Sequence, residues 1–271
     1  MKVYTIDKNG ELAFEVPFRS FVRGINHRGY NTIAPENTLP AYILSAKKGF
    51  RYVETDISFT AADADNPNGV PVLLHDQTIN RCSNGTGYLK DMTFAQVRQY
   101  DFGSWKSAEY AGTKIPALAE FLPLCRNLGL HPYLEIKDTE QYTQAQLQLI
   151  VDTVRSYGMR GNVSYISFNA SFLATIKTLD EYARLGIVCN NVTSTEITTA
   201  QSLMTGTNDV FIDSGTASDA QYQLCKDANI PLERWTMNVK AGIVNLDDYI
   251  SGVTSDSLNA EYIKYEKSLI S

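Results

Sequence analysis

Three acidic residues stand at spacings that would let them share one metal ion. Glu54 and Asp56 are two residues apart in the apolar run Tyr52–Ile57, and this spacing places both side chains on one face of a strand. Glu135 lies in a second apolar run, Pro132–Ile136. Buried carboxylates repel one another unless a cation lies between them, and an oxygen-only ligand set suits Mg²⁺ or Ca²⁺ better than Zn²⁺. The sequence therefore predicts one divalent cation, Mg²⁺ or Ca²⁺, bound by these three acids.

Two histidines and two cationic residues stand in similar positions, beside an apolar run. His27 and His75 are two of the three histidines in the chain. A histidine pair with pKa values near neutrality can supply one base and one acid, and the sequence leaves their order open. Arg28 and Lys137 add fixed positive charge for a phosphate group. Such a set suits cleavage of a phosphodiester, because the transition state needs charge neutralised and protons moved.

Some of these residues have a second interpretation. Glu135 and Lys137 are two residues apart and could form a salt bridge inside a barrel. Trp235 stands at the end of an apolar run, where core packing and a wall of a substrate site are equally good interpretations. Glu36 and Asn37 precede a helix and are expected to support its first turn, and a role of Asn37 inside a site is the alternative.

The elements that have to position these residues alternate along the chain. Strand-length apolar runs occur at Gly24–His27, Tyr52–Ile57, Val70–His75, Pro132–Ile136, Val163–Phe168, Ala183–Val188, Asp209–Asp213, Leu232–Met237 and Gly252–Ser255. Between many of them lie amphipathic segments of helix length, among them Thr38–Lys48, Glu140–Tyr157, Ala170–Tyr182 and Ala217–Asn229. This alternation predicts an α/β fold in which helices cover a parallel sheet.

One of the nine runs does not fit a parallel sheet. Ten residues separate Phe59 from Val70, whereas a parallel crossover needs a dozen or more. We therefore expect Val70–His75 to form an antiparallel hairpin with the strand before it. Eight parallel strands remain, and eight strands that close on themselves form a (β/α)8 TIM barrel. Catalytic groups of such barrels lie at the carboxyl ends of the strands, which is where the acids, histidines and cations fall.

Two segments lie outside the repeating units. Residues 1–20 contain the alternating stretches Val3–Ile6 and Leu12–Val16 and are expected to form a small hairpin that covers one end of the barrel. Residues from 76 to about 115 contain no strand–helix unit, and we expect a loop insertion on the rim that carries His75. The barrel domain is thus predicted to span residues 21–271 and to include this insertion.

Composition narrows the possible partners. The chain of 271 residues has a net charge of −6, which disfavours nucleic acid and anionic membranes. The four cysteines are far apart and are expected to be free thiols.

The first residues contain no long apolar run, so we expect no signal peptide and no transmembrane segment. The expected location is cytoplasmic, or extracellular if a signal has been removed, and the oligomeric state is left open. His131 precedes a strand at the far end of the barrel and is expected to be exposed.

The residues at the strand ends, in this order and spacing, resemble the glycerophosphodiester phosphodiesterase family of the phosphatidylinositol-phospholipase-C-like barrel superfamily. The matching motifs are His27-Arg28-Gly29, Pro35-Glu36-Asn37-Thr38, Glu54-Thr55-Asp56, Val72-Leu73-Leu74-His75-Asp76, Glu135-Ile136-Lys137, Trp235-Thr236-Met237-Asn238 and Ser255-Asp256. The resemblance extends over about residues 21 to 260. The turn Ala61–Gly69 is longer than is usual in the family, and this difference bears on substrate preference.

The resemblance implies metal-dependent hydrolysis of small glycerophosphodiesters to glycerol 3-phosphate and an alcohol. It implies a divalent ion held by Glu54, Asp56 and Glu135. It also implies that His27 and His75 are the acid–base pair, and we expect Arg28, Lys137 and Trp235 to bind substrate. In the implied mechanism the glycerol 2-hydroxyl attacks phosphorus, and water opens the cyclic phosphate that forms.

Two alternatives remain. The same fold and metal would also suit a lysophospholipase D or an enzyme that acts on polyglycerol-phosphate wall polymers. A large exposed apolar patch beside the site would favour the lipid substrate. An alternative of another class is a non-catalytic module that binds metal and phosphate. Loss of either histidine would have indicated such a module, and both are present.

Overall fold

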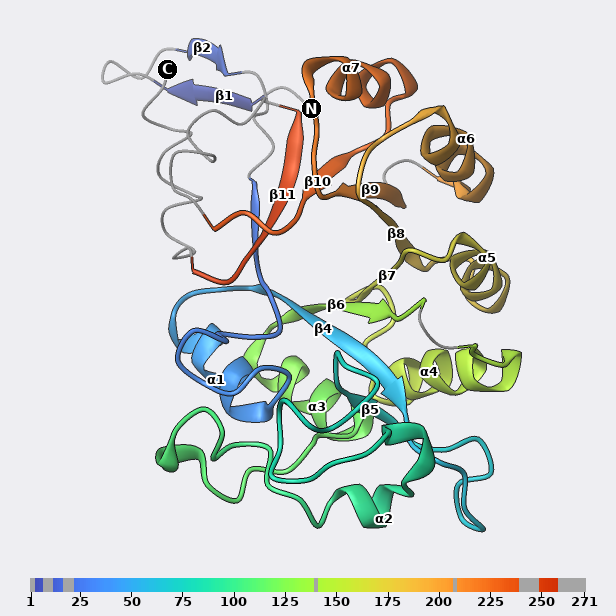
Figure 1. The fold of residues 1–271 in the computed structure, drawn as a ribbon. Coiled ribbons are helices and arrows are strands. Elements are labelled where there is room, and N and C mark those ends of the chain that lie inside the picture. The colour runs from blue at the N-terminus through green and yellow to red at the C-terminus, as the bar shows by residue number, and fades with distance from the viewer. Residues whose placement is uncertain are drawn as a thin grey trace.

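Parallel strands close into a barrel in the computed structural model, which describes residues 3–6, 12–16, 22–138, 141–206, 209–238 and 249–257 (Figure 1). Within these residues, eight parallel strands follow one another around the barrel. They are β3 (Arg23–Asn26), β4 (Tyr52–Phe59), β6 (His131–Ile136), β7 (Ser164–Ser167), β8 (Arg184–Cys189), β9 (Val210–Ser214), β10 (Leu232–Arg234) and β11 (Ile250–Ser255). β3 pairs with both β11 and β4, which closes the ring. The predicted (β/α)8 TIM barrel is confirmed.

Helices between the strands lie around the outside of the barrel (Figure 1). They are α1 (Leu39–Lys47), α3 (Leu118–Leu128), α4 (Gln144–Ser156), α5 (Ala170–Leu179), α6 (Ser194–Leu203) and α7 (Asp219–Ala228). The sequence of α4 explains its fold, because Thr143 and Gln146 form a capping box at its start. Its buried residues Leu147, Ile150, Val151 and Val154 recur three or four positions apart. Apolar faces of this kind pack on the strands and form the main core.

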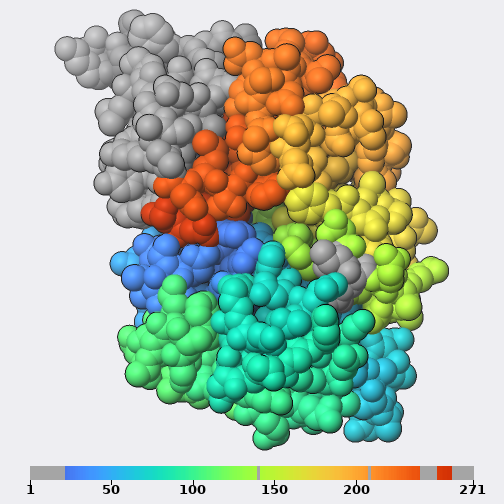
Figure 2. All heavy atoms as spheres, in the orientation of Figure 1, coloured from blue at the N-terminus to red at the C-terminus, as the bar shows by residue number. Residues whose placement is uncertain are grey.

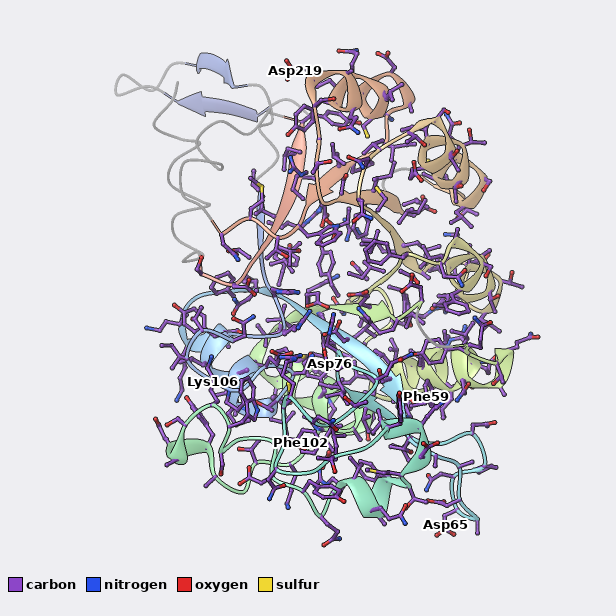
Figure 3. The ribbon with its side chains drawn as sticks, in the orientation of Figure 1. Phe59, Asp65, Asp76, Phe102, Lys106 and Asp219 are labelled. Atoms are coloured by element: carbon purple, nitrogen blue, oxygen red, sulfur yellow. The ribbon has the colours of Figure 1, made fainter. Side chains whose placement is uncertain are left out.

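The run after the long turn is an antiparallel partner of β4, as predicted. β5 (Pro71–Leu73) pairs with the end of β4, so that Ile57 faces Leu73 and Phe59 faces Pro71. In Figure 3, Phe59 marks the end of β4 and Asp65 the outer end of the turn. The hairpin carries the chain to His75 on the rim.

The insertion after β5 is irregular, as expected, but it has a small core of its own. It contains three short helices, η1 (Leu89–Asp91), α2 (Phe94–Val97) and η2 (Ala108–Tyr110). Its core consists of Ile79, Cys82, Leu89, Val97, Phe102 and Ile115, which pack with Val72 of β5 and with Leu74 directly after it. Figure 2 shows the atoms of this segment, coloured teal to green, packed as one lobe of the molecule. The insertion is therefore a packed structure on which side chains of the rim can be held in place.

The N-terminal hairpin is also present. β1 (Val3–Ile6) and β2 (Leu12–Val16) pair in the antiparallel sense, whereas the turn between them lies outside the described residues. Coverage of a barrel end by this hairpin stays a prediction. Among the helices of the described ranges, none has the length and apolarity required to cross a bilayer.

Two expectations about single residue types have different outcomes. The four cysteines lie in the described part of the chain and are buried free thiols, as predicted. The predicted exposure of His131 is wrong. Its ring packs on Tyr52 with 5.5 Å between centroids, and its Nε2 lies 3.0 Å from Oγ of Ser164. Burial, assisted by the charge of Arg184, lowers the pKa of His131 to about 3.

A glycine in the barrel wall makes room for an aromatic ring. A Cβ added at Gly186 of β8 would lie 2.3 Å from Cζ of Phe211. We expect Gly186→Ala to lower the free energy of unfolding by about 1–3 kcal/mol, because overpacking a filled core displaces its neighbours. Urea denaturation would measure the loss. The substitution should cost less in a Phe211→Leu background, and an equal cost in both backgrounds would contradict this explanation.

Candidate active site

The eight residues predicted for the site meet at the carboxyl ends of the strands. A cavity of about 320 Å³ is lined by His27, Arg28, Glu54, His75, Glu135, Lys137 and Trp235. The eighth residue, Asp56, is fully buried next to this cavity and belongs to the same acidic cluster as Glu54 and Glu135. The structure therefore brings all eight side chains to one place, whereas their chemical roles stay predictions.

The acidic cluster consists of Glu54, Asp56 and Glu135, which offer oxygen atoms within 4.8 Å of one another. Glu54 Oε1 and Asp56 Oδ1 are buried and accept no hydrogen bond. Burial and the charge of Asp56 raise the pKa of Glu54 to about 8 and that of Glu135 to about 7. For Asp56, burial acts in the same direction, but the charges of Arg28 and Lys137 outweigh it and lower the pKa. A divalent cation fits this set, because it would use the unpaired oxygens and remove the mutual repulsion.

A buried amide holds Asp56 in place. Asn37 Nδ2 donates a hydrogen bond of 2.7 Å to Asp56 Oδ2, and Asn37 Oδ1 accepts hydrogen bonds from Thr55 Oγ1 and Tyr42 Oη. The expectation that Asn37 supports the first turn of α1 as a cap is wrong, because its amide forms the contacts above, and the N-cap residue Thr38 makes no side-chain cap. The alternative, that Asn37 points into the site, describes the observed contact.

The turn after β3 positions both its histidine and its arginine. Arg28 and Gly29 have φ angles of 52° and 76°, in the left-handed region that favours glycine. A Cβ on Gly29 would lie 2.7 Å from Cβ of Ala41, so the turn requires glycine there. The turn directs the backbone N–H of Arg28 to Glu54 Oε2, at 2.9 Å.

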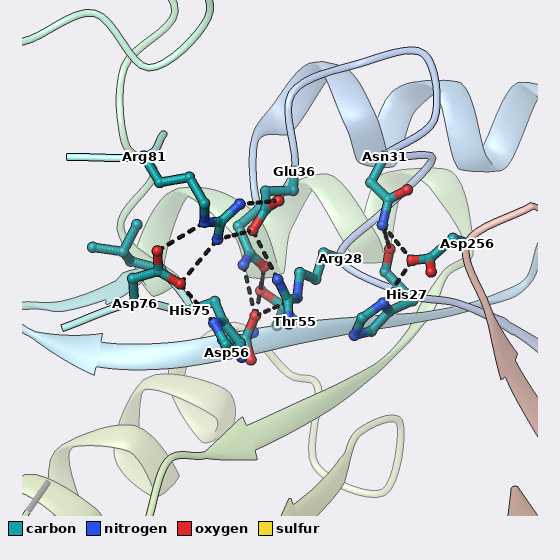
Figure 4. A network of polar contacts seen from close by, with 12 residues as sticks. His27, Arg28, Asn31, Glu36, Thr55, Asp56, His75, Asp76, Arg81 and Asp256 are labelled. Carbon is teal, nitrogen blue, oxygen red and sulfur yellow. Dashed lines mark hydrogen bonds and ion pairs between the residues drawn. The ribbon is translucent and has the colours of Figure 1, made fainter. Parts of the chain in front are cut away.

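His27 is fixed by an aspartate from the other end of the chain. Its Nδ1 donates a hydrogen bond of 2.6 Å to Asp256 Oδ1, which also accepts one from Asn31 Nδ2 (Figure 4). Its Nε2 lies 3.9 Å from Glu54 Oε2. Burial lowers the pKa of His27, but the hydrogen bond to Asp256 and the charge of Glu54 outweigh burial, so the net pKa is raised.

His75 is fixed in the same way by its neighbour in sequence. Its Nδ1 donates to Asp76 Oδ1 over 2.8 Å, and Asp76 in turn accepts hydrogen bonds from Arg81 (Figure 4). Burial lowers the pKa of His75, although the charge of Asp56 acts in the opposite direction. In both rings Nδ1 is bound to a carboxylate, so Nε2 is the nitrogen left for proton transfer.

The cations are tied to the acids. Arg28 Nη1 donates to Glu36 Oε1 over 3.0 Å, and Arg28 Nε lies 3.3 Å from Asp56 Oδ2. Lys137 Nζ lies 2.8 Å from Glu135 Oε1 and 3.5 Å from Asp56 Oδ1. The salt bridge between Glu135 and Lys137 is thus present, and it leaves Lys137 on the cavity wall, where an anion would be bound.

The sequence interpretation did not assign roles to three residues of this network. Asp76 and Asp256 orient the histidines, and Arg81 joins Asp76 to Glu36 with four hydrogen bonds of 2.8 to 2.9 Å. Asp76 could have been found, because it directly follows His75. The partnership of Asp256 with His27 spans 229 positions, and only the closure of the barrel between β11 and β3 brings them together.

Comparisons with known proteins agree with the fold and the motifs. The family described as Glycerophosphoryl diester phosphodiesterase family matches residues 27–260. The chain is 40% identical over 121 residues to Glycerophosphodiester phosphodiesterase 1 of Bos taurus, which covers 44% of this chain and 35% of that protein. It is 27% identical over 164 residues to a Glycerophosphodiester phosphodiesterase of Caldanaerobacter subterraneus subsp. tengcongensis, covering 60% of this chain and 65% of that protein. The matched segment therefore spans about a third of the bovine relative and about two thirds of the bacterial one.

Solved structures share the fold. A phosphodiesterase of Oleispira antarctica, in complex with the product sn-glycerol-3-phosphate, superimposes with a TM-score of 0.72 at 24% identity and covers 92% of this chain and 97% of that one. A glycerophosphodiester phosphodiesterase of Agrobacterium tumefaciens superimposes with a TM-score of 0.71 at 22% identity, covering 89% of this chain and 99% of that one.

Proposed function

Because the chain belongs to the glycerophosphoryl diester phosphodiesterase family, we propose that it hydrolyses glycerophosphodiesters to glycerol 3-phosphate and an alcohol. The observation that carries the proposal is the meeting of two aspartate-bound imidazoles, two cations and three acids around one cavity of about 320 Å³. The names of the curated relatives, and the product bound to the Oleispira antarctica phosphodiesterase, support the same reaction.

We propose that Glu54, Asp56 and Glu135 hold one divalent cation, Mg²⁺ or Ca²⁺. Two of these carboxylates have an oxygen that is buried without a hydrogen bond, which supports this assignment. When bound, the cation would act as a Lewis acid that polarises the phosphoryl group. Arg28 and Lys137 face the same cavity and would bind the phosphate oxygens as fixed charges.

The two histidines would move the protons. In the first step, Nε2 of one ring accepts the proton of the glycerol 2-hydroxyl, whose oxygen attacks phosphorus. Nε2 of the other ring gives its proton to the departing alcohol oxygen, and a cyclic phosphate forms. In the second step water attacks phosphorus. The imidazole that gave its proton now accepts one from this water, and the other imidazole gives its proton to the 2-oxygen as the cyclic phosphate opens. Asp256 and Asp76 keep each ring oriented through Nδ1, and the order of acid and base remains open.

Two further cavities beyond His75, lined by both polar and apolar side chains, bear on the alcohol group of the substrate. A cavity of about 450 Å³ is lined by His75 and Lys137, which also line the active-site cavity. A further cavity of about 530 Å³ is lined by Gln77, which also lines the cavity of 450 Å³. The polar lining of the larger one includes Thr60, Asn68, Gln77, Lys90, Gln141 and Gln146. Of the large apolar side chains exposed in the described ranges, Tyr88 alone lines one of these cavities. The scarcity of exposed large apolar side chains at these cavities, within the described ranges, supports a soluble glycerophosphodiester over a lysophospholipid.

Release of glycerol 3-phosphate from glycerophosphocholine tests the proposed function. We expect turnover with Mg²⁺ or Ca²⁺ and none after chelation of the metal with EDTA. Glycerophosphoethanolamine and lysophosphatidylcholine, assayed in parallel, test the preference for a soluble diester. A protein that binds metal and glycerol 3-phosphate but turns over none of these diesters would be a binding module instead.

The contact between Asn37 and Asp56 gives a separate prediction. Asn37→Ala removes the donor to Asp56 Oδ2, and we expect a loss of about 10–100-fold in metal affinity, as is typical when a residue that hydrogen-bonds a metal ligand is lost. Isothermal titration with MgCl₂ or CaCl₂ would measure it. Asn31→Ala is the matched control, because Asn31 bonds Asp256 and none of the three acids. Equal metal affinities for the two variants would refute this role of Asn37.

A further inference from the structure

Two buried polar groups of the active-site cavity have no partner. Asp213 Oδ1 and Thr254 Oγ1 are buried and form no hydrogen bond within the described structure. The two residues are only 2% and 3% exposed, and both line the cavity that also contains His27 and Trp235. An unpaired buried group of this kind is destabilising, because it has lost its hydrogen bonds to water without replacing them. Two such groups on one cavity wall therefore indicate a ligand that would complete their hydrogen bonds.

These groups lie on the part of the wall that the acids, histidines and cations leave unused. Asp213 ends β9 together with Ser214, and Thr254 is the penultimate residue of β11. β10 lies between these strands, and Trp235 follows it directly. The indole Nε1 of Trp235 donates to the backbone oxygen of Asp213 over 3.1 Å, which fixes the ring in the wall. Neither Asp213 nor Thr254 belongs to the acidic cluster, so one metal ion held there would not satisfy them.

The chemistry of this wall selects a neutral hydroxyl group. Arg28 and Lys137, the cations that line the cavity, are bound to acids of the cluster. Trp235 and Phe168 pack edge to face, with 5.7 Å between centroids, and offer apolar surface to the carbon atoms of a ligand. Burial, with the charge of Glu233, raises the pKa of Asp213 well above its ordinary value and so favours the neutral carboxyl group over the carboxylate. A hydroxyl group is both donor and acceptor and can hydrogen-bond to either of these groups, whereas a quaternary ammonium group has no N–H to donate and no lone pair to accept.

We propose that Asp213 and Thr254 form a subsite that binds the terminal hydroxyl group of the glycerol unit, with Trp235 and Phe168 against its carbon chain. This inference rests on the proposed function, since it assigns the glycerol unit to the cavity. The subsite would select glycerol diesters over diesters of a diol that has the 2-hydroxyl but lacks the terminal one. Asp213 and Thr254 are then specificity-determining residues and take no part in proton transfer.

Two phosphates that differ in a single hydroxyl group test the subsite. Glycerol 3-phosphate has the terminal hydroxyl, and 2-hydroxypropyl phosphate has a methyl group in its place. In calorimetric titrations of the full chain with Mg²⁺, we expect the wild type to bind glycerol 3-phosphate about 10–100-fold more tightly, in line with one or two hydrogen bonds to otherwise unpaired groups. Thr254→Val and Asp213→Ala should reduce this ratio, and should change the affinity for 2-hydroxypropyl phosphate less than twofold. Asp213→Asn retains a donor and an acceptor and should preserve most of the preference.

The outcomes separate this inference from the proposed reaction. Equal affinities of the wild type for the two phosphates, or an unchanged ratio in Thr254→Val and Asp213→Ala, would overturn the subsite and leave ordered water as its occupant. A failure of the wild type to bind either phosphate would overturn the subsite, whereas only a failure to turn over glycerophosphodiesters would refute the proposed function. A preference for glycerol 3-phosphate that depends on both residues, in a protein without turnover of glycerophosphodiesters, would support the subsite and refute the hydrolysis. Thermal unfolding curves of each variant would verify that it is folded.

Discussion

His27→Ala and His75→Ala are each expected to reduce the turnover number for glycerophosphocholine by about 10²–10⁴-fold, the usual contribution of a positioned acid or base. Each ring has Nδ1 tied to an aspartate and Nε2 left for proton transfer, so its loss removes one of the two proton carriers. The Michaelis constant should change much less, because the proposed phosphate contacts of Arg28 and Lys137 remain. Steady-state release of glycerol 3-phosphate, measured with saturating metal, would separate the two constants.

His131→Ala is the matched control for both substitutions. His131 begins β6 at the end of the barrel opposite to the site and packs on Tyr52. Its substitution should lower the stability of the protein and leave the turnover number near that of the wild type. Equal turnover in the wild type, His27→Ala and His75→Ala would refute the assignment of the pair.

Substitution of the aspartate that orients His27 should have a smaller effect than loss of the histidine itself. Asp256→Asn retains the size of the side chain but not the charge that orients and stabilises the imidazolium of His27. Asp256→Asn should reduce turnover less than His27→Ala does. The double variant His27→Ala/Asp256→Asn should be no slower than His27→Ala alone, because the two residues act as one unit.

The strands could be read from the sequence because most are buried on both faces and therefore appear as apolar runs. The run Tyr52–Ile57 is continued as β4 (Tyr52–Phe59), and the short link before Val70 identified the antiparallel hairpin correctly. The acids of the cluster followed from the alternation of side chains along a strand, since Glu54 and Asp56 share a face.

Contacts that depend on barrel closure could not be read in this way. The partnership of His27 with Asp256 requires β11 beside β3, and no local pattern contains that information. Asn37 looked like a helix cap, because its type and place suit a cap, whereas the structure directs its amide to Asp56. The apolar run that ends at Asp213 indicated a strand, but not that its carboxyl group would be buried in the cavity without a partner.

The second large effect is expected from the acidic cluster. Glu135→Gln retains the shape of the side chain and removes one of the three negative charges that would face the cation. We expect metal affinity and turnover to fall by more than the roughly 10–100-fold that is typical when a residue that hydrogen-bonds a metal ligand is lost. A bound metal should also stabilise the wild type, by about 2.7 kcal/mol at a concentration of 100 times its dissociation constant. Thermal unfolding of the wild type and of Glu135→Gln at the same metal concentrations would measure how much the metal stabilises each protein.

Glu233→Gln separates loss of the metal from loss of a buried charge in general. Glu233 is a buried acid of the barrel interior bound to Arg23 at 2.7 Å and to Arg184 at 2.9 Å, and it lies outside the acidic cluster. Its substitution should destabilise the protein with and without metal but preserve the gain in stability on metal addition. An equal gain in Glu135→Gln and the wild type would mean that the cation binds elsewhere. If Glu135→Gln instead lost the gain but retained turnover, a cation in this cluster would have a structural role, and the phosphate charge would have to be neutralised by Arg28 and Lys137 alone.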